Sequence, residues 1–116
     1  RNRGGKEPRG GNMPVAPKEV RDVAESALER RRRYGRGGTS VGVARARDIV
    51  NGVNLSMDTI RRMVSFFDRH SGNESENKAR QDRTSAAAIA WDLWGGNPGR
   101  RFAERILREK GGSYER

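Results

Sequence analysis

Apolar residues recur in the first third of the chain at intervals of three and four, which is the spacing of one face of an α-helix. Pro17 suits the first turn of a helix, and Gly35 is typical of the position after the last turn. The pattern therefore predicts a helix over residues 17–34. Its apolar stripe consists of Val20, Val23, Ala24, Ala27 and Leu28.

Four further segments show the same periodicity and predict helices over residues of about 40–50, 56–70, 85–94 and 97–107. Their expected N-caps are Thr39 or Ser40, Ser56, and Thr84 or Ser85. Residues 72–83 are polar throughout except Ala79, so a solvated loop is expected there. Because no segment alternates with period two, we expect an all-α domain of about five short helices.

The first 16 residues have a different composition from the rest of the chain. They contain four glycines, two prolines and four cations against one acid, without periodicity. This composition is typical of a flexible basic arm, which could follow a phosphate backbone or be inert. The expected organisation is thus an arm over residues 1–16, a helical domain over residues 17–110 and a flexible tail over residues 111–116.

The charge balance of the chain indicates the kind of partner that it binds. The chain carries 25 lysines and arginines against 15 acidic residues, a net charge of +10, and most of the cations are arginines. A planar guanidinium binds phosphate oxygens bidentately, so the balance favours a nucleic-acid partner, DNA before RNA. An arginine-rich genome composition is the alternative explanation. No apolar run approaches the length of a membrane helix, so no membrane partner is expected.

Arginines are densest in the stretch "ERRRRYGRGGTS", residues 29–40. The candidate phosphate contacts here are Arg30, Arg31, Arg33 and Arg36. The alternative is that these cations only complement the dipole at the end of a helix. The glycines that follow lack both the lysine of a nucleotide-binding P-loop and the third glycine of a dinucleotide fingerprint, which excludes both motifs.

Residues 44–67 match much of a helix-turn-helix pattern. With Ala46 at its first position, the inward positions are all apolar, and Asn54 stands where the turn needs a left-handed residue. Val50 is bulkier than such a crossing prefers. The inward residues would be Ile49, Val53, Leu55, Ile60 and Met63. In this arrangement Arg61 and Arg62 would face a DNA groove, with Arg45 as a further contact. The alternative is an ordinary helical corner with solvated arginines.

No residue set predicts catalysis, a cofactor or a metal site. His70 is the single histidine and no cysteine is present, so His70 is expected to cap or pack rather than to bind zinc. Asp68, Glu76 and Lys78 vaguely match a nuclease set, but no strand edges are predicted to hold them. Trp91 and Trp94 have the spacing of core residues more than of a base-stacking platform. We therefore do not expect an enzyme.

Three motifs, "GRGGT-VGVARAR", "RRM-SFF-RH" and "IAW-LWGG", occur together within residues 27–107, most of the expected folded part. In this combination the chain resembles a small module found in proteins of tailed bacteriophages and prophages. Members of that family carry a longer connection before the "IAW" motif, where this chain has "RTSAA". The resemblance implies a phage origin and a setting in the host cytoplasm or the virion, and it transfers no catalytic residue.

The sequence thus leaves two alternative functions. The preferred one is a small basic phage protein that binds nucleic acid mainly through phosphate contacts. The alternative is a structural or adaptor module of the virion, or a module that binds a host protein, with its basic face on an acidic protein partner.

Overall fold

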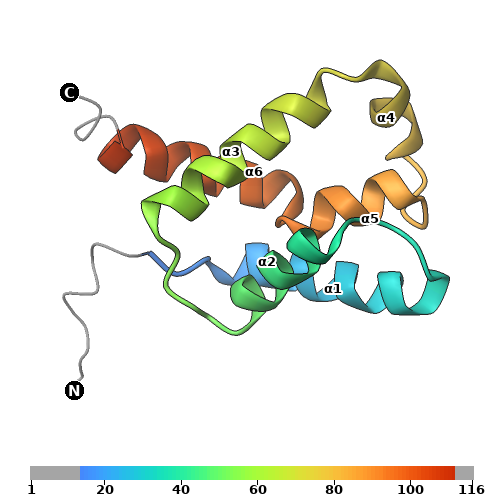
Figure 1. Ribbon diagram of the computed structural model, residues 1–116, viewed down its shortest axis with the longest axis horizontal. Coiled ribbons are helices and arrows are strands. Elements are labelled where there is room, and N and C mark those ends of the chain that lie inside the picture. Colours follow the sequence, from blue (N-terminus) through green and yellow to red (C-terminus); the bar gives the residue numbers. More distant parts are fainter. Residues whose placement is uncertain (1–13, 112–116) are drawn as a thin grey trace.

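The computed structural model describes residues 14–111, and within that range the chain forms helices and no strand (Figure 1). The prediction of an all-α domain is confirmed. The elements are α1 (Lys18–Tyr34), α2 (Ser40–Val50), α3 (Met57–Ser71), α4 (Glu74–Ala79), α5 (Ala86–Leu93), α6 (Gly96–Ile106) and the π-helical turn η3 (Leu107–Gly111).

Side-chain caps fix where the helices begin. The hydroxyls of Thr39, Ser56 and Ser85 accept hydrogen bonds from backbone N–H groups in the first turns of α2, α3 and α5. Each such bond satisfies a donor that the helix leaves unpaired. At the other end of α1, Gly35 has a φ of 65°, and its N–H donates to the carbonyl of Arg31 over 2.8 Å. These predicted boundaries are confirmed.

The helices pack around one core. Helix α1 lies against α2, α5 and α6, while α3 crosses α6 (Figure 1). Both tryptophans belong to this core, as expected, because Trp91 and Trp94 are 5% and 9% exposed. Phe66 stacks on Trp94 with ring centroids 4.7 Å apart, and Phe67 meets Trp91 edge-on. The aromatic cluster thus joins α3 to α5.

The segment that was expected to be a solvated loop contains the short helix α4. Asn73 caps it by accepting a hydrogen bond from the N–H of Glu76, and Glu76 lies 2.8 Å from Nδ1 of His70. The ring of His70 packs on Phe66, which confirms the expected packing role of the histidine. Because polar side chains rather than an apolar stripe hold α4 in place, hydrophobic periodicity could not reveal it.

The connection from α2 to α3 departs from the helix-turn-helix pattern. Gly52, with a φ of 70°, is left-handed as a tight turn requires, whereas Asn54, expected to be left-handed too, does not have a positive φ. Val53, expected in the core, is 43% exposed, although Ile49, Leu55, Ile60 and Met63 are buried as predicted. Helix α2 packs on α1 and α5, whereas α3 packs on α6 and α4. The packing therefore corresponds to an ordinary helical corner.

The last residues assigned to the arm belong to the domain instead. The carbonyl of Pro14 accepts a hydrogen bond from the N–H of Leu55 over 2.7 Å, and Ala16 is buried. This pairing holds the segment before α1 against the α2–α3 connection. The rest of the expected arm, residues 1–13, and residues 112–116 of the expected tail lie outside the described residues.

Candidate nucleic-acid interface

A groove of about 480 Å³ runs between α3, the start of α2 and α5. Its floor is formed by Phe66, Trp94 and Ala90, of which the two aromatic side chains are almost fully buried. Its other lining residues are Gly38, Thr39, Val41, Asp58, Arg61, Arg62, Ser65, Arg69 and His70. The groove therefore combines an apolar floor with a basic rim.

The basic rim comes from one face of α3. Arg62 and Arg69 are seven residues apart, which places them on the same helix face two turns apart, and Arg61 adjoins Arg62. All three side chains are exposed. From Arg61 to Arg69 the helix rises by about 12 Å, so the face is long enough to meet more than one phosphate of a strand.

Local charge pairing on this face is weak. Arg62 lies 3.1 Å from Asp58, but both side chains are more than half exposed, and an exposed pair of this kind contributes little. Arg69 forms no ion pair with any residue between 14 and 111. An incoming anion therefore meets little internal competition for the guanidinium groups of Arg62 and Arg69.

The opposite wall of the groove is the N-terminus of α2. Thr39 caps this helix through the N–H of Gly42, while the N–H groups of the first turn have no intrahelical acceptor. Gly37 and Gly38 have φ values of 104° and 77°, so the loop turns sharply into the helix. The positive end of the helix dipole thus adjoins the arginines of α3.

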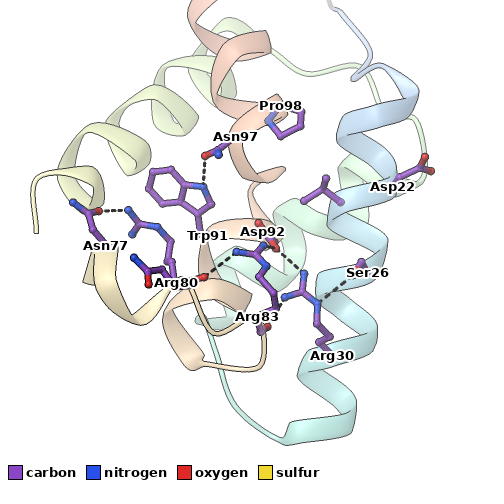
Figure 2. A pocket seen from close by; sticks show the side chains of 12 residues that line it. Asp22, Ser26, Arg30, Asn77, Arg80, Arg83, Trp91, Asp92, Asn97 and Pro98 are labelled. Carbon is purple, nitrogen blue, oxygen red and sulfur yellow. Dashed lines mark hydrogen bonds and ion pairs between the residues drawn. The ribbon is translucent and has the colours of Figure 1, made fainter. Parts of the chain in front are cut away.

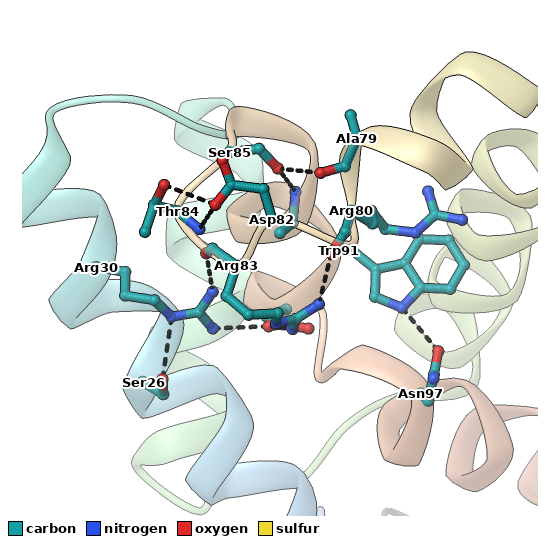
Figure 3. A network of polar contacts seen from close by, with 12 residues as sticks. Ser26, Arg30, Ala79, Arg80, Asp82, Arg83, Thr84, Ser85, Trp91 and Asn97 are labelled. Carbon is teal, nitrogen blue, oxygen red and sulfur yellow. Dashed lines mark hydrogen bonds and ion pairs between the residues drawn. The ribbon is translucent and has the colours of Figure 1, made fainter.

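Two of the predicted phosphate contacts, Arg30 and Arg31, make hydrogen bonds within the fold. Arg30 is 17% exposed and donates to Asp92, to the backbone carbonyl of Arg83 and to Ser26 (Figure 3). The Nε of Arg31 donates to the carbonyl of Gly37 over 2.8 Å. Their guanidinium groups hold the end of α1 to neighbouring segments, and a contact of Arg30 or Arg31 with a partner stays a prediction.

The remaining arginines of the same stretch are exposed around Tyr34. The guanidinium carbons of Arg33 and Arg36 lie 5.7 and 5.9 Å from the centre of the tyrosine ring. Arg36 also donates to the carbonyl of Thr84 over 2.9 Å. Arg33 thus keeps the exposure expected of a contact residue, and Arg36 combines exposure with a role in holding the loop.

Arg45 supports the groove from below rather than lining it. Its side chain is 14% exposed, pairs with Asp48 over 3.1 Å and lies 5.5 Å from the ring centre of Trp94. A contact of Arg45 with a partner therefore stays a prediction. Arg61 and Arg62, by contrast, do lie together at the groove.

Sequence reasoning missed Arg69 as a residue that lines this groove. The seven-residue interval from Arg62 to Arg69 was a usable signal, because it places both on one helix face. No sequence signal showed that Thr39 would face α3, since that arrangement depends on how α2 and α3 pack on the other helices.

Other kinds of site find little support in the described part of the chain. Residues 14–111 contain no group of three or more histidine, cysteine, aspartate or glutamate side chains that could hold a metal ion. None of the described helices is long and apolar enough to span a membrane. Comparisons with known protein families, curated proteins and solved structures find no match to the chain.

Proposed function

We propose that the protein binds the phosphate backbone of nucleic acid through the groove beside α3. The observation that carries the proposal is the alignment of Arg61, Arg62 and Arg69 on one exposed helix face, opposite the N-terminus of α2. Guanidinium groups donate charge-assisted hydrogen bonds to phosphate oxygens, and a helix N-terminus favours an anion. Both walls of the groove thus attract the same kind of group.

The binding would depend little on sequence. Phosphate contacts position a protein on nucleic acid without reading bases, and the corner between α2 and α3 gives no support for a recognition helix seated in a DNA groove. Arg33, in the last turn of α1, and Arg36, on the loop that leads to α2, would extend the basic surface. In this proposal the chain acts as a phage protein in the host cytoplasm or the virion, as its sequence resemblance implies.

The test is a salt titration of binding to a labelled DNA duplex, a single strand and an RNA by fluorescence anisotropy. The wild-type affinity is expected to fall steeply with salt. In the triple variant with alanine at Arg61, Arg62 and Arg69, the slope of log K against log salt should shrink by about three, because each lost phosphate contact removes about one unit.

A matched control separates the effect of the groove arginines on binding from the effect of net charge. Alanine at Arg47, Arg101 and Arg108, three exposed arginines outside the groove, removes the same charge. This control variant should retain most of the wild-type slope of log K against log salt. Equal losses in both triple variants would contradict the groove, and the absence of binding at low salt would contradict nucleic-acid binding altogether.

The floor of the groove favours a second candidate, an acidic protein partner. Val41 is 52% exposed at the rim, beside the apolar floor, and could receive an apolar side chain of an acidic peptide. Such a partner would bind stoichiometrically, without a steep salt dependence on DNA. Val41→Asp would then abolish binding to the partner, whereas phosphate binding would lose much less.

A further inference from the structure

A second cavity, of about 830 Å³, lies between α1, the segment around α4, α5 and the start of α6 (Figure 2). It shares no lining residue with the groove beside α3. Its charged groups include three arginines, Arg30, Arg80 and Arg83, against Asp22 and Asp92. Asp22 pairs with Lys18 outside the cavity, and Asp92 is shared by Arg30 and Arg83, so neither carboxylate pairs with Arg80.

The acceptor oxygens of this cavity are largely occupied by internal donors. Oδ2 of Asp92 accepts from both Arg30 and Arg83, and Oδ1 of Asn97 accepts from the indole N–H of Trp91 over 2.9 Å (Figure 2). The hydroxyl oxygen of Ser26 accepts from Arg30. A ligand rich in hydrogen-bond donors would therefore find few acceptors here.

The donors of the cavity remain available in contrast. The amide NH₂ of Asn97 and the hydroxyl hydrogen of Ser26 belong to groups whose oxygens are already bonded. Arg80 stacks on Trp91, with its guanidinium carbon 3.8 Å from the ring centre. Between residues 14 and 111 Arg80 pairs with no carboxylate, and its single side-chain bond goes to the amide oxygen of Asn77.

The electrostatics of Arg80 agree with this arrangement. Partial burial lowers its pKa, and the nearby guanidinium groups of Arg100 and Arg83 lower it further, against the opposing effects of Glu76 and Asp92. The folded chain thus holds a partly desolvated cation beside other cations. An anion in the cavity would relieve that repulsion.

We propose that this cavity is a binding site for a phosphate monoester. The phosphate group would accept hydrogen bonds from Arg80, Asn97 and Ser26, with Arg83 adding charge. A tetrahedral dianion accepts from several directions, which suits donors that come from α1, α5–α6 and the segment after α4 better than a planar carboxylate does. The proposal is independent of nucleic-acid binding at α3.

The test follows the two indole N–H signals of the ¹⁵N-labelled protein during titration with inorganic phosphate at constant ionic strength. Trp91 borders this cavity and Trp94 the other groove, so each indole reports on one site. We expect a saturable shift of the Trp91 signal, with little change for Trp94. A shift of Trp94 alone, or a change that never saturates, would overturn the proposal without touching the proposed function.

Variants sharpen the result. Arg80→Gln should remove the saturable shift, and Ser26→Ala, which leaves the stacked arginine in place, should weaken the affinity several-fold. Arg101→Gln, a change at an exposed arginine outside the cavity, should bind phosphate as the wild type does. A wild-type response in both Arg80→Gln and Ser26→Ala would refute the site.

Titrations with further ligands identify the kind of molecule that carries the phosphate. Adenosine 5′-monophosphate should shift the Trp91 signal and adenosine should not, whereas an equal response to acetate would refute the preference for phosphate. If a 5′-phosphorylated oligonucleotide also shifts this signal and its 5′-hydroxyl counterpart does not, the cavity receives the end of a strand. A response to the mononucleotide alone identifies a free phosphorylated metabolite.

Discussion

The guanidinium of Arg30 lies 2.6 Å from the carboxylate of Asp92, although the two residues are 62 positions apart in the chain. Asp92 is 3% exposed, and Arg83 donates to the same carboxylate oxygen (Figure 2). One buried charge thus binds α5 to the end of α1 and to the segment between α4 and α5. Several consequences of this arrangement can be measured.

Asp92→Asn should strongly destabilise the fold, because the change leaves two arginines beside a neutral amide. Breaking a buried ion pair by removing one partner costs about 3–5 kcal/mol. Urea denaturation gives the free energy of unfolding for this comparison. Asp22→Asn, which removes an exposed carboxylate paired with Lys18, is the control and should change stability by less than about 1 kcal/mol. Similar effects of the two substitutions would show that the buried network contributes little.

Neighbouring arginines at the end of α1 should differ in how much their substitution lowers the stability of the fold. Arg31→Ala removes the hydrogen bond to the carbonyl of Gly37 and should cost about 1 kcal/mol. Arg33→Ala removes an exposed side chain and should change stability by less than about 0.5 kcal/mol. Thermal unfolding of both variants measures the difference. A larger loss for Arg33→Ala than for Arg31→Ala would contradict these assignments.

Gly99→Ala should destabilise the protein although alanine is the better helix former. A Cβ at Gly99 would lie 2.6 Å from the backbone oxygen of Trp94, so the start of α6 would have to shift away from the end of α5. Gly72 is the matched control, because its φ is negative and a Cβ there meets nothing closer than 4.0 Å. Gly72→Ala should be neutral or stabilise by up to about 1 kcal/mol. Both effects can be read from urea midpoints.

Stability should also depend on Asp82 in acid. Hydrogen bonds from the backbone N–H and the hydroxyl of Thr84 lower the pKa of this carboxyl in the folded chain. A lowered pKa means that the stabilisation is complete above the unfolded pKa of about 4 and is lost as the pH falls through the folded value. Comparing the unfolding midpoints of the wild type and Asp82→Ala from pH 6 to pH 2 isolates this contribution. The gap between them should narrow as the pH falls, and a constant gap would contradict the prediction.

Much of the fold could be predicted because buried apolar residues recur every three or four positions along a helix. Ile49, Ile60 and Met63 are buried as their spacing indicated, and the serine and threonine caps mark helix starts because their hydroxyls satisfy local N–H groups. These effects act within a few residues of each other. Local sequence is sufficient to show them.

The site could be predicted only in part, because an arginine looks the same in sequence whether it meets solvent or a buried carboxylate. Arg30 and Arg33 stand three residues apart in one basic run, yet the first pairs with Asp92 and the second is exposed. What separates them is the position of α5, which is set by packing far along the chain. Arg61 and Arg62 are exposed as expected, because their exposure follows from the apolar stripe of their own helix.

The packing of α1 against α5 and α6 has a consequence for how the chain folds. The first helix can bury much of its apolar surface, and can pair with its buried charge partner, only after residues near the other end of the chain have been synthesised. Partial unfolding of α1 would therefore expose Asp92 and loosen α5 together with it. We expect hydrogen exchange in α1 and α5 to occur through one shared opening, with the domain behaving as a single cooperative unit.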